Sequence, residues 1–421
     1  MKKDQTNYKK VASYEAHPGE FSRCLLLYSG GLDTSVILKW IKEKYNCDVI
    51  TLTLDIGQQV DDLKAIEEKA KKLGAVKTIT YDARNDFAEL ILAKAIKANA
   101  DYQGGYALST PLGRVIISQL AVKFAKENNC QVIAHGATGK GNDQVRFESY
   151  ITTLDSSLKI IAPVREWSMG REEELAYAEE HGIEVSQTQD SPYSKDESMW
   201  GITSEGAEIE HPNLVPKMHN ILSWCNPIDK TPNKPERITI SFDNGVPVAI
   251  DDKRMSLSEI ITACNSIGAE HGVGVVNLIE DRLVGLKVRG VYENPGATIL
   301  ITAHKKLEQL VSTRFENEMK EMMDIKWSYM VYAAQWYEPA LSHIQAYIDN
   351  QNKKVVGDVT VELFKGSVVV ACLDSPYSLF DHNLATFNSN ESFNQNASAG
   401  FIEIYSLSQK TAHGVYDYEK E

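Results

Sequence analysis

The sequence predicts an α/β protein: a parallel sheet covered by helices, followed by a second half of α+β type. In the first half, the apolar runs RCLLLYS, DVITLTL and QVIAHGA alternate with stretches of helical spacing. Strands that read as continuous apolar runs are typical of parallel sheets buried on both faces. After about residue 185 the chain becomes polar and irregular, and ITISFDNGVPVAI and VTVELFKGSVVVACL then read as hairpins.

The individual elements follow from apolar periodicity and turn residues. The first strand starts at Arg23 and leads through a glycine turn into a helix whose apolar positions begin at Val36. A helix through VDDLKAIEEKAKKL ends before Gly74, and VKTITY forms a short strand. Two further helices are expected over 86–98 and 111–128, and the two hairpins turn at Asn244-Gly245 and Lys365-Gly366. The last stretch, SLSQKTAHGVYDYEKE, is polar and is not expected to fold on its own.

Composition narrows the class of protein. With 421 residues, 43% of them hydrophobic, the chain is long enough for two domains. A net charge of -14 argues against a nucleic-acid partner. Six cysteines without a C-x-x-C pair fit free thiols in a reducing cytoplasm. No apolar run approaches the length of a membrane span, and the N-terminus resembles neither a signal nor a transit peptide, so we expect a soluble, cytoplasmic protein.

The strongest local signal is the segment from Ser29 to Ser35, SGGLDTS, between a buried strand and a helix. Two glycines let the backbone approach an anion, and the amides of the turn and of the helix N-terminus then point at it. The segment lacks the lysine and spacing of a Walker loop, which indicates a site for pyrophosphate that leaves as a unit. The alternative is a tight turn in which Asp33 or Thr34 caps the helix.

A second glycine-rich segment, HGATGKGNDQVRF from His135 to Phe147, also follows an apolar strand. Arg146 suits a carboxylate, Asp143 suits an ammonium group, and Lys140 suits a phosphate. The loop is therefore a candidate site for amino-acid zwitterions. Its alternative interpretation is an irregular surface turn.

Taken together, these motifs resemble the argininosuccinate synthases. The resemblance is carried by YSGGLDTS, DIGQ, AIKANADYQGGY, HGATGKGNDQVRFE, SPYSKDE and IEDRLVGLKVRGVYENP, and it extends from about Arg23 nearly to the C-terminus. It implies an ATP-pyrophosphatase domain of HUP-like (adenine nucleotide alpha hydrolase-like) fold over residues 23–185 and an α+β synthetase/multimerisation domain over 186–402. A polar extension would precede them at 1–22, and a C-terminal oligomerisation arm would follow at 403–421.

The resemblance also implies an activity and its site residues. The enzyme would be an AMP-forming carbon–nitrogen ligase of arginine biosynthesis that acts on ATP, L-citrulline and L-aspartate as a homotetramer, with Mg²⁺ carried by ATP and no metal site built by the protein. Asp33, Thr34 and Ser35 would be catalytic. The ATP-binding residues would be Leu27, Tyr28, Ser29, Gly30, Gly31, Leu32, Asp33, Thr34, Ser35, Leu54 and Gly136. Citrulline would contact Tyr106, Thr110, Asn142, Arg146, Ser194, Thr203, Glu280 and Tyr292. Aspartate would contact Thr138, Asn142 and Asp143.

Two positions depart from the family pattern. Pro111 stands where many relatives have a citrulline-contacting serine, and its neighbour Thr110 is the expected substitute. Thr203 replaces another usual serine but keeps the hydroxyl group. The aromatic residues from Trp327 to Tyr337 are interpreted as core or subunit interface.

The mechanism implied is adenylation. The ureido oxygen of citrulline would attack the α-phosphorus of ATP, and the amine of aspartate would then displace AMP. Two rival hypotheses remain: another ATP pyrophosphatase, such as an amidotransferase-type synthetase or a tRNA-thiolating enzyme, or a ligand-binding relative without turnover. The sequence shows neither a glutaminase nucleophile nor the basic patches those enzymes would bring.

Overall fold

The computed structural model describes residues 8–59, 62–139, 141–167, 169–184, 192–386 and 393–416. The chain divides into two compact units, one up to Tyr377 and one from Ser378 onward, and each is considered by itself. Among the described residues, no helix is long and apolar enough to cross a membrane.

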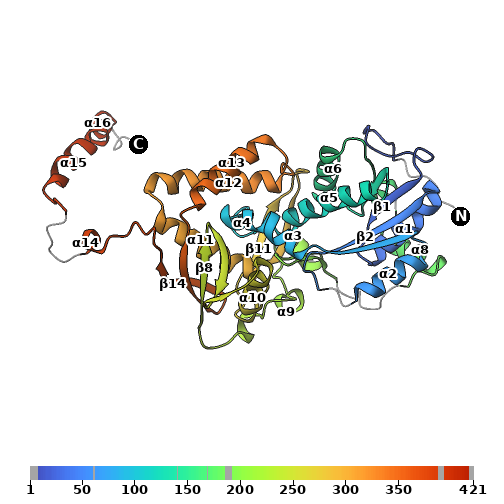
Figure 1. The fold of residues 1–421 in the computed structure, drawn as a ribbon, viewed down its shortest axis with the longest axis horizontal. Coiled ribbons are helices and arrows are strands. Elements are labelled where there is room, and N and C mark those ends of the chain that lie inside the picture. The colour runs from blue at the N-terminus through green and yellow to red at the C-terminus, as the bar shows by residue number, and fades with distance from the viewer. Residues whose placement is uncertain are drawn as a thin grey trace. The chain divides into compact units, whose positions relative to one another are not determined.

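The first half of the larger unit is built on a five-stranded sheet of order β3-β2-β1-β4-β5, in which every pair is parallel (Figure 1). Its strands are β1 (Arg23–Leu27), β2 (Asp48–Asp55), β3 (Lys77–Asp82), β4 (Val132–Ala134) and β5 (Lys159–Ile161). The predicted parallel sheet is therefore confirmed. The three-residue strand β5 was not predicted from the sequence, because so short an apolar run carries no periodicity.

Helices cover both faces of this sheet. Successive side chains of each strand point to opposite faces, and both sets are apolar and need to be buried. Cys24 and Leu26 of β1 pack in one hydrophobic cluster, whereas Leu25 between them packs in another. The first face is covered by α1 (Leu32–Tyr45), α2 (Leu63–Lys72) and α8 (Arg171–Glu180). The opposite face is covered by α5 (Ser109–Glu127) and α6 (Asp143–Leu154) (Figure 1).

The helix expected over 86–98 is present but interrupted. It consists of α3 (Arg84–Phe87), the π-helical turn η1 (Ala88–Leu92) and α4 (Ala93–Lys97). The apolar residues Phe87, Ile91 and Ile96 remain buried through the interruption. A further short helix, α7 (Pro163–Glu166), follows β5 at the carboxyl edge of the sheet and begins with proline at its first position.

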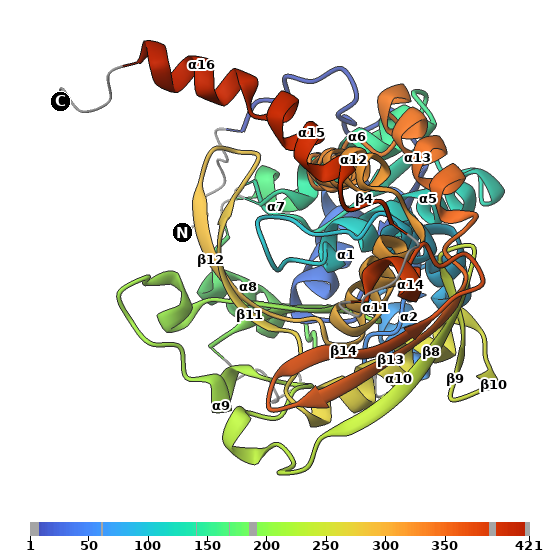
Figure 2. The ribbon, with the colours of Figure 1, turned by 90° about the vertical axis from the view of Figure 1, so that its left-hand side faces the viewer.

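The second half of the unit contains two antiparallel sheets (Figure 2). One has the order β10-β9-β8-β13-β14, with β8 (Glu236–Asp243), β9 (Val246–Ile250), β10 (Lys253–Arg254), β13 (Gly357–Phe364) and β14 (Ser367–Asp374). The other has the order β11-β12-β7-β6, with β6 (Ser194–Ser198), β7 (Gly201–Glu205), β11 (Val275–Asp281) and β12 (Lys287–Glu293). Both predicted hairpins are confirmed. Their turn residues Asn244, Gly245, Lys365 and Gly366 all adopt positive φ.

Helices pack between and around these sheets. The long ones are α10 (Leu257–Glu270), α11 (Pro295–Val311), α12 (Arg314–Tyr332) and α13 (Pro339–Asn352). The short ones are η2 (Ala207–Glu210), α9 (Met218–Ile221) and η3 (Ile228–Lys230). Trp327, Val331 and Tyr332 of α12 are buried, as expected for a core helix.

The second unit is helical, with α14 (His382–Ala385), α15 (Ala397–Tyr405) and α16 (Leu407–Val415). The sequence had indicated a polar tail without independent structure. The described part of the tail does form helices, but none of their side chains is buried. Residues 387–392 and 417–421 lie outside the described residues.

Candidate active site

The first glycine-rich loop joins β1 to α1 and is shaped by its two glycines. Gly30 has a φ of +80°, and a Cβ atom there would lie 2.8 Å from the side chain of Ile66. The nitrogen of Lys69 donates to the carbonyl of Gly30 at 2.9 Å, which fixes that peptide from the side of α2. The backbone conformation at this position therefore requires glycine.

The amide groups at the start of α1 are open. Gly31 is the N-cap residue and makes no side-chain cap, so neither Asp33 nor Thr34 caps the helix and the capping alternative is wrong. The Gly31 amide donates to the Ser29 hydroxyl at a long 3.4 Å. Among the described residues, the amides of Leu32 and Thr34 have no hydrogen-bond acceptor. A helix N-terminus in this state attracts an anion.

Hydroxyl groups line the same loop. The Ser29 and Thr34 hydroxyls lie 3.1 Å apart at its exposed rim. The Ser35 hydroxyl donates inward to the carbonyl of Gly31 at 2.6 Å and lies 3.1 Å from the Tyr28 hydroxyl. Asp33 is exposed in the first turn of α1. The rim thus offers oxygen ligands beside the open amides.

The two glycine-rich loops lie side by side. β1 and β4 are neighbours in register, with Leu26 opposite Ala134, so both chains leave the sheet at the same carboxyl edge. A Cβ atom on Gly136 would lie 3.0 Å from Ile37 and 3.9 Å from the methyl group of Thr34, both on α1. Leu54, at the end of β2 on the other side of β1, completes the row of expected ATP contacts.

The second loop is held by a buried chain of polar side chains. His135 accepts a hydrogen bond from the Ala137 amide through Nδ1, which leaves Nε2 to donate to Glu148 at 3.1 Å. Arg165 also binds Glu148, at 2.6 Å, and it donates to Gln144 at 3.0 Å. Gln144 in turn donates to a backbone carbonyl of the loop. Burial raises the pKa of Glu148, but His135 and Arg165 outweigh it and hold the pKa below its ordinary value. Lys140, the expected phosphate ligand, lies outside the described residues.

Behind this loop stands a cluster of charged side chains. Arg114 of α5 donates to Asp143 at 2.8 Å and to Asp196 of β6 at 2.7 Å. Arg146 donates to the other oxygen of Asp143 at 3.0 Å. Burial raises the pKa of Asp143, but the two guanidinium groups lower it by more than burial raises it. The net pKa lies below the ordinary value, so the carboxylate stays charged. Arg114 was not predicted as a site residue. The available signal was a cation inside the apolar run PLGRVIISQL of a buried helix.

The residues expected to contact citrulline come from both halves of the unit and lie close together. Glu280 of β11 accepts from the hydroxyls of Tyr292 and Tyr332, each at 2.5 Å, and from Asn142 at 3.4 Å. The ring of Tyr106 lies 4.4 Å from that of Tyr292. Burial first, and then the charge of Glu280, raise the pKa of both Tyr292 and Tyr332 well above the ordinary value, so both hydroxyls remain donors.

Tyr332 was interpreted from the sequence as core or interface. It is buried, but it also contacts the expected citrulline-binding residues, which that interpretation did not include. Its hydroxyl also accepts from Asn142 at 2.8 Å, and its ring stacks on Tyr102 with centroids 3.8 Å apart. Its carbonyl accepts from Arg146 at 3.1 Å. Tyr332 therefore links the expected binding residues Asn142, Arg146 and Glu280.

Arg146 is buried, and its donors are engaged with the protein. Only 3% of the residue is exposed, and its guanidinium group lies between Asp143 and the carbonyl of Tyr332. Each of the three nitrogens of the fork that we expected to bind a carboxylate thus already donates to the protein. Only the second N–H groups of its two terminal nitrogens are without an acceptor among the described residues.

The remaining expected contacts lie on α5, on β6 and β7, and in the second glycine-rich loop. The hydroxyls of Thr110 and Thr203 are 3.2 Å apart, and Thr110 also donates to Asp196 at 2.7 Å. Ser194 begins β6, is exposed, and lies two residues before Asp196, hence on the same face of the strand. Thr138 is exposed in the second glycine-rich loop.

Comparisons with known proteins agree along nearly the whole chain. Residues 23–184 match the family model of the Arginosuccinate synthase N-terminal HUP domain, and residues 193–412 match that of the Arginosuccinate synthase C-terminal domain. A protein of Pyrococcus furiosus called argininosuccinate synthase is 46% identical over 398 residues, which cover 94% of this chain and 96% of the relative. Its namesake in Picrophilus torridus is 45% identical over 383 residues, with 91% and 95% covered. A namesake in Clostridium perfringens is 40% identical over 389 residues, with 92% and 96% covered.

Proposed function

The chain belongs to the argininosuccinate synthase family and is an ATP-using ligase of this kind, and we propose how its residues join L-citrulline to L-aspartate. The products are argininosuccinate, AMP and pyrophosphate, in arginine biosynthesis. The observation that carries the proposal is the proximity of the two glycine-rich loops, where Gly136 lies beside Ile37 and Thr34 at the start of α1.

The first step forms a citrullyl-adenylate. The ureido oxygen of citrulline attacks the α-phosphorus of ATP in line, a new P–O bond forms, and the bond to the oxygen that bridges to the β-phosphorus breaks. Pyrophosphate leaves into the loop from Ser29 to Ser35, whose open amides and hydroxyls stabilise its charge. The protein supplies position and electrostatic stabilisation, and no nucleophilic side chain is required.

Magnesium would be carried by ATP, and the rim of the first loop fits it, because the Ser29 and Thr34 hydroxyls lie there and oxygen is the ligand type that Mg²⁺ prefers. The ion would neutralise phosphate charge. Asp33, exposed in the first turn of α1, would act on the phosphates through that ion, and Thr34 and Ser35 hold the start of α1.

In the second step the amine of aspartate, after losing its proton, attacks the activated ureido carbon. A C–N bond forms, the C–O bond to AMP breaks, and AMP leaves. Thr138, Asn142 and Asp143 hold aspartate, with Asp143 on the ammonium group. Arg114 is a positioning residue here, because it keeps Asp143 charged and oriented.

Citrulline lies between the two halves of the unit. Tyr106, Asn142, Glu280 and Tyr292 form the wall around it, and Arg146 binds its carboxylate through terminal N–H groups beside its present acceptors. Thr110, Ser194 and Thr203 supply hydroxyl groups beside this wall, since Thr203 pairs with Tyr292 and the amide of Thr110 donates to the Tyr106 hydroxyl.

The test is pyrophosphate release from ATP, citrulline and aspartate, with each substrate omitted in turn. A synthase releases pyrophosphate continuously only with all three. Release without citrulline would indicate another ATP pyrophosphatase, and binding of all three without release would indicate a relative that has lost turnover.

We also propose that the enzyme is a cytoplasmic homotetramer whose tail packs on a neighbouring copy. Phe401, Ile404 and Tyr405 of α15 are each at least 64% exposed, although helices of nine residues are marginal in water without packing. Five of its six cysteines are buried free thiols, which suits a reducing compartment.

Deletion of residues 403–421 should therefore reduce the oligomer mass measured by light scattering. Ile404→Lys, which places a charge on the apolar face, should reduce it as well, whereas Gln409→Lys at an exposed polar position of α16 should not. An unaltered mass after both the deletion and Ile404→Lys would refute the role of the tail.

A further inference from the structure

Residues 8–22, here called the N-terminal segment, pack on the half of the unit that contains the five-stranded parallel sheet. Residue 23 is where the match to the N-terminal family model begins, so the segment lies before it. The amide of Ala16 donates to the carbonyl of Ile160, and the amide of Ile160 donates to the carbonyl of Tyr14. The segment thus adds a parallel bridge to the outer edge of β5.

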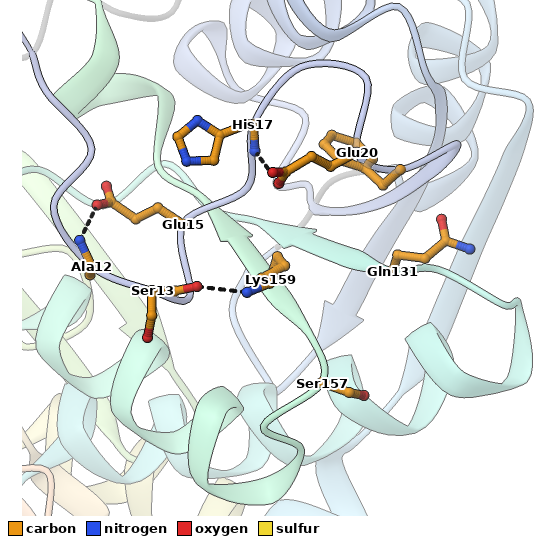
Figure 3. Close-up of a pocket in the computed structure, with 9 residues that line it drawn as sticks. Ala12, Ser13, Glu15, His17, Glu20, Gln131, Ser157 and Lys159 are labelled. Carbon is orange, nitrogen blue, oxygen red and sulfur yellow. Dashed lines mark hydrogen bonds between the residues drawn. The ribbon is translucent and has the colours of Figure 1, made fainter.

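The segment is held mainly by polar contacts. Within residues 8–22 only Glu15 and Ala16 are buried. Beneath the segment is a polar cavity of about 460 Å³, lined among others by Glu15, His17 and Lys159 (Figure 3). Lys159 donates to the carbonyl of Ser13 at 2.6 Å at its rim. The apolar contribution of the segment to the domain comes from Ala16 and from the partly buried Tyr14 and Phe21.

Glu15 is the central contact. One carboxylate oxygen accepts from the amides of Val11 and Ala12, each at 2.9 Å. The other accepts from the hydroxyl of Tyr8 and lies 3.8 Å from the guanidinium group of Arg165. Burial raises the pKa of Glu15, but these hydrogen bonds and Arg165 bring it below the ordinary value, so the carboxylate stays charged.

Arg165 connects the segment to the second glycine-rich loop. It binds Glu148, which accepts from His135, and it donates to Gln144. Tyr14 is also near Glu148: burial and then the interaction with that carboxylate raise the pKa of Tyr14 to about 12. Two residues of the segment thus act on the two side chains that hold the loop.

We propose that the N-terminal segment positions the second glycine-rich loop, with Glu15 acting through Arg165 and Glu148. Glu15 touches no substrate and is a positioning residue. The inference rests on the proposed function, because Gly136 and Thr138 in this loop are the expected ATP and aspartate contacts. Asn142, beyond the loop, is anchored separately by Tyr332 and Leu283. The segment therefore affects ATP and aspartate more than citrulline.

The decisive variant is Glu15→Gln in the full-length protein. The amide oxygen can still accept from Val11 and Ala12, whereas the attraction to Arg165 is lost. The matched control is Glu20→Gln, because Glu20 lies in the same segment and, within the described part of the chain, accepts only from the amide of His17. Deletion of residues 1–22 is a second, stronger variant.

Two measurements read the result. For Glu15→Gln, the KM of ATP and of aspartate should rise roughly 3- to 10-fold, while the KM of citrulline changes less than about 2-fold. Without substrates, amide hydrogen exchange of residues 136–146 should become faster, while that of residues 28–35 stays the same. Glu20→Gln should change neither quantity.

Equal rises of all three KM values, or exchange at 136–146 equal to that of Glu20→Gln, would overturn the inference. If the wild-type protein released no pyrophosphate, the proposed function would fail, but hydrogen exchange would still decide whether the segment holds the loop. If the deletion variant does not fold, Glu15→Gln gives the decision alone.

Discussion

The two halves of the active site are prepared for their ligands in different ways. The first glycine-rich loop binds through its backbone, and the amides of Leu32 and Thr34 have no acceptor among the described residues. The citrulline region binds through side chains, and these side chains already make hydrogen bonds within the protein. Asn142 donates to Glu280, and Arg146 donates to Asp143 and to the carbonyl of Tyr332. The amides of the phosphate site are thus free to bind a ligand, whereas the polar side chains of the amino-acid site are already bonded to the protein.

This difference predicts different responses to mutation. An open backbone site loses affinity when its conformation changes, because no side chain can replace an amide that points the wrong way. A site of bonded side chains loses affinity when one of these groups is removed, and its neighbours are then left unpaired as well. Substitutions in the two regions should therefore separate the KM of ATP from the KM of citrulline.

The largest effect is expected for Arg146→Ala. Loss of the charge-assisted bonds to the citrulline carboxylate should cost about 2–3 kcal/mol, or roughly 30- to 150-fold in the KM of citrulline. Steady-state kinetics with citrulline varied measures it. Arg314→Ala, at an exposed arginine of α12, is the control. A citrulline KM equal to that of the wild type would remove Arg146 from the carboxylate site.

The next effect in size is expected for Gly30→Ala. A residue with a Cβ atom at a φ of +80° costs about 1–2 kcal/mol, and here the Cβ also meets Ile66. The KM of ATP should rise by about 5- to 30-fold, with the KM of citrulline nearly unchanged. Gly182→Ala is the matched control, because Gly182 also has positive φ but has no neighbour among the described residues within 4 Å of the added Cβ. Equal KM values of ATP in the two variants would show that the first loop does not depend on this conformation.

The smallest effect is expected for Tyr332→Phe. The substitution keeps the ring and the carbonyl that accepts from Arg146, and it removes only the hydroxyl between Asn142 and Glu280. One hydrogen bond of this kind contributes about 1 kcal/mol, so the KM of citrulline should rise by roughly 5-fold. Tyr329→Phe on the exposed side of the same helix serves as the control. If both variants behave alike, Tyr332 belongs to the core alone.

Much of the nucleotide half was predictable because its signals are local. Continuous apolar strands and a glycine turn before Leu32 determine the sheet edge and the open helix start. Parallel pairing then brings Gly136 beside that turn, as the order of strand and helix implied. The interruption of the helix at η1 was not predictable, because its apolar spacing continues unbroken.

The amino-acid half depends on contacts between distant parts of the chain. Arg114 and Tyr332 look like members of buried helices, and only their partners Asp143, Asp196 and Glu280 place them at the site. The position of Arg146 depends on a backbone carbonyl 186 residues away. No local pattern in the sequence reports such a contact.

The most direct test of the account uses citrulline labelled with ¹⁸O at the ureido oxygen. If that oxygen attacks the α-phosphorus at the meeting point of the two loops, one turnover with ATP and aspartate must place the label in AMP and leave pyrophosphate unlabelled. Unlabelled AMP, or label in pyrophosphate, would contradict the account.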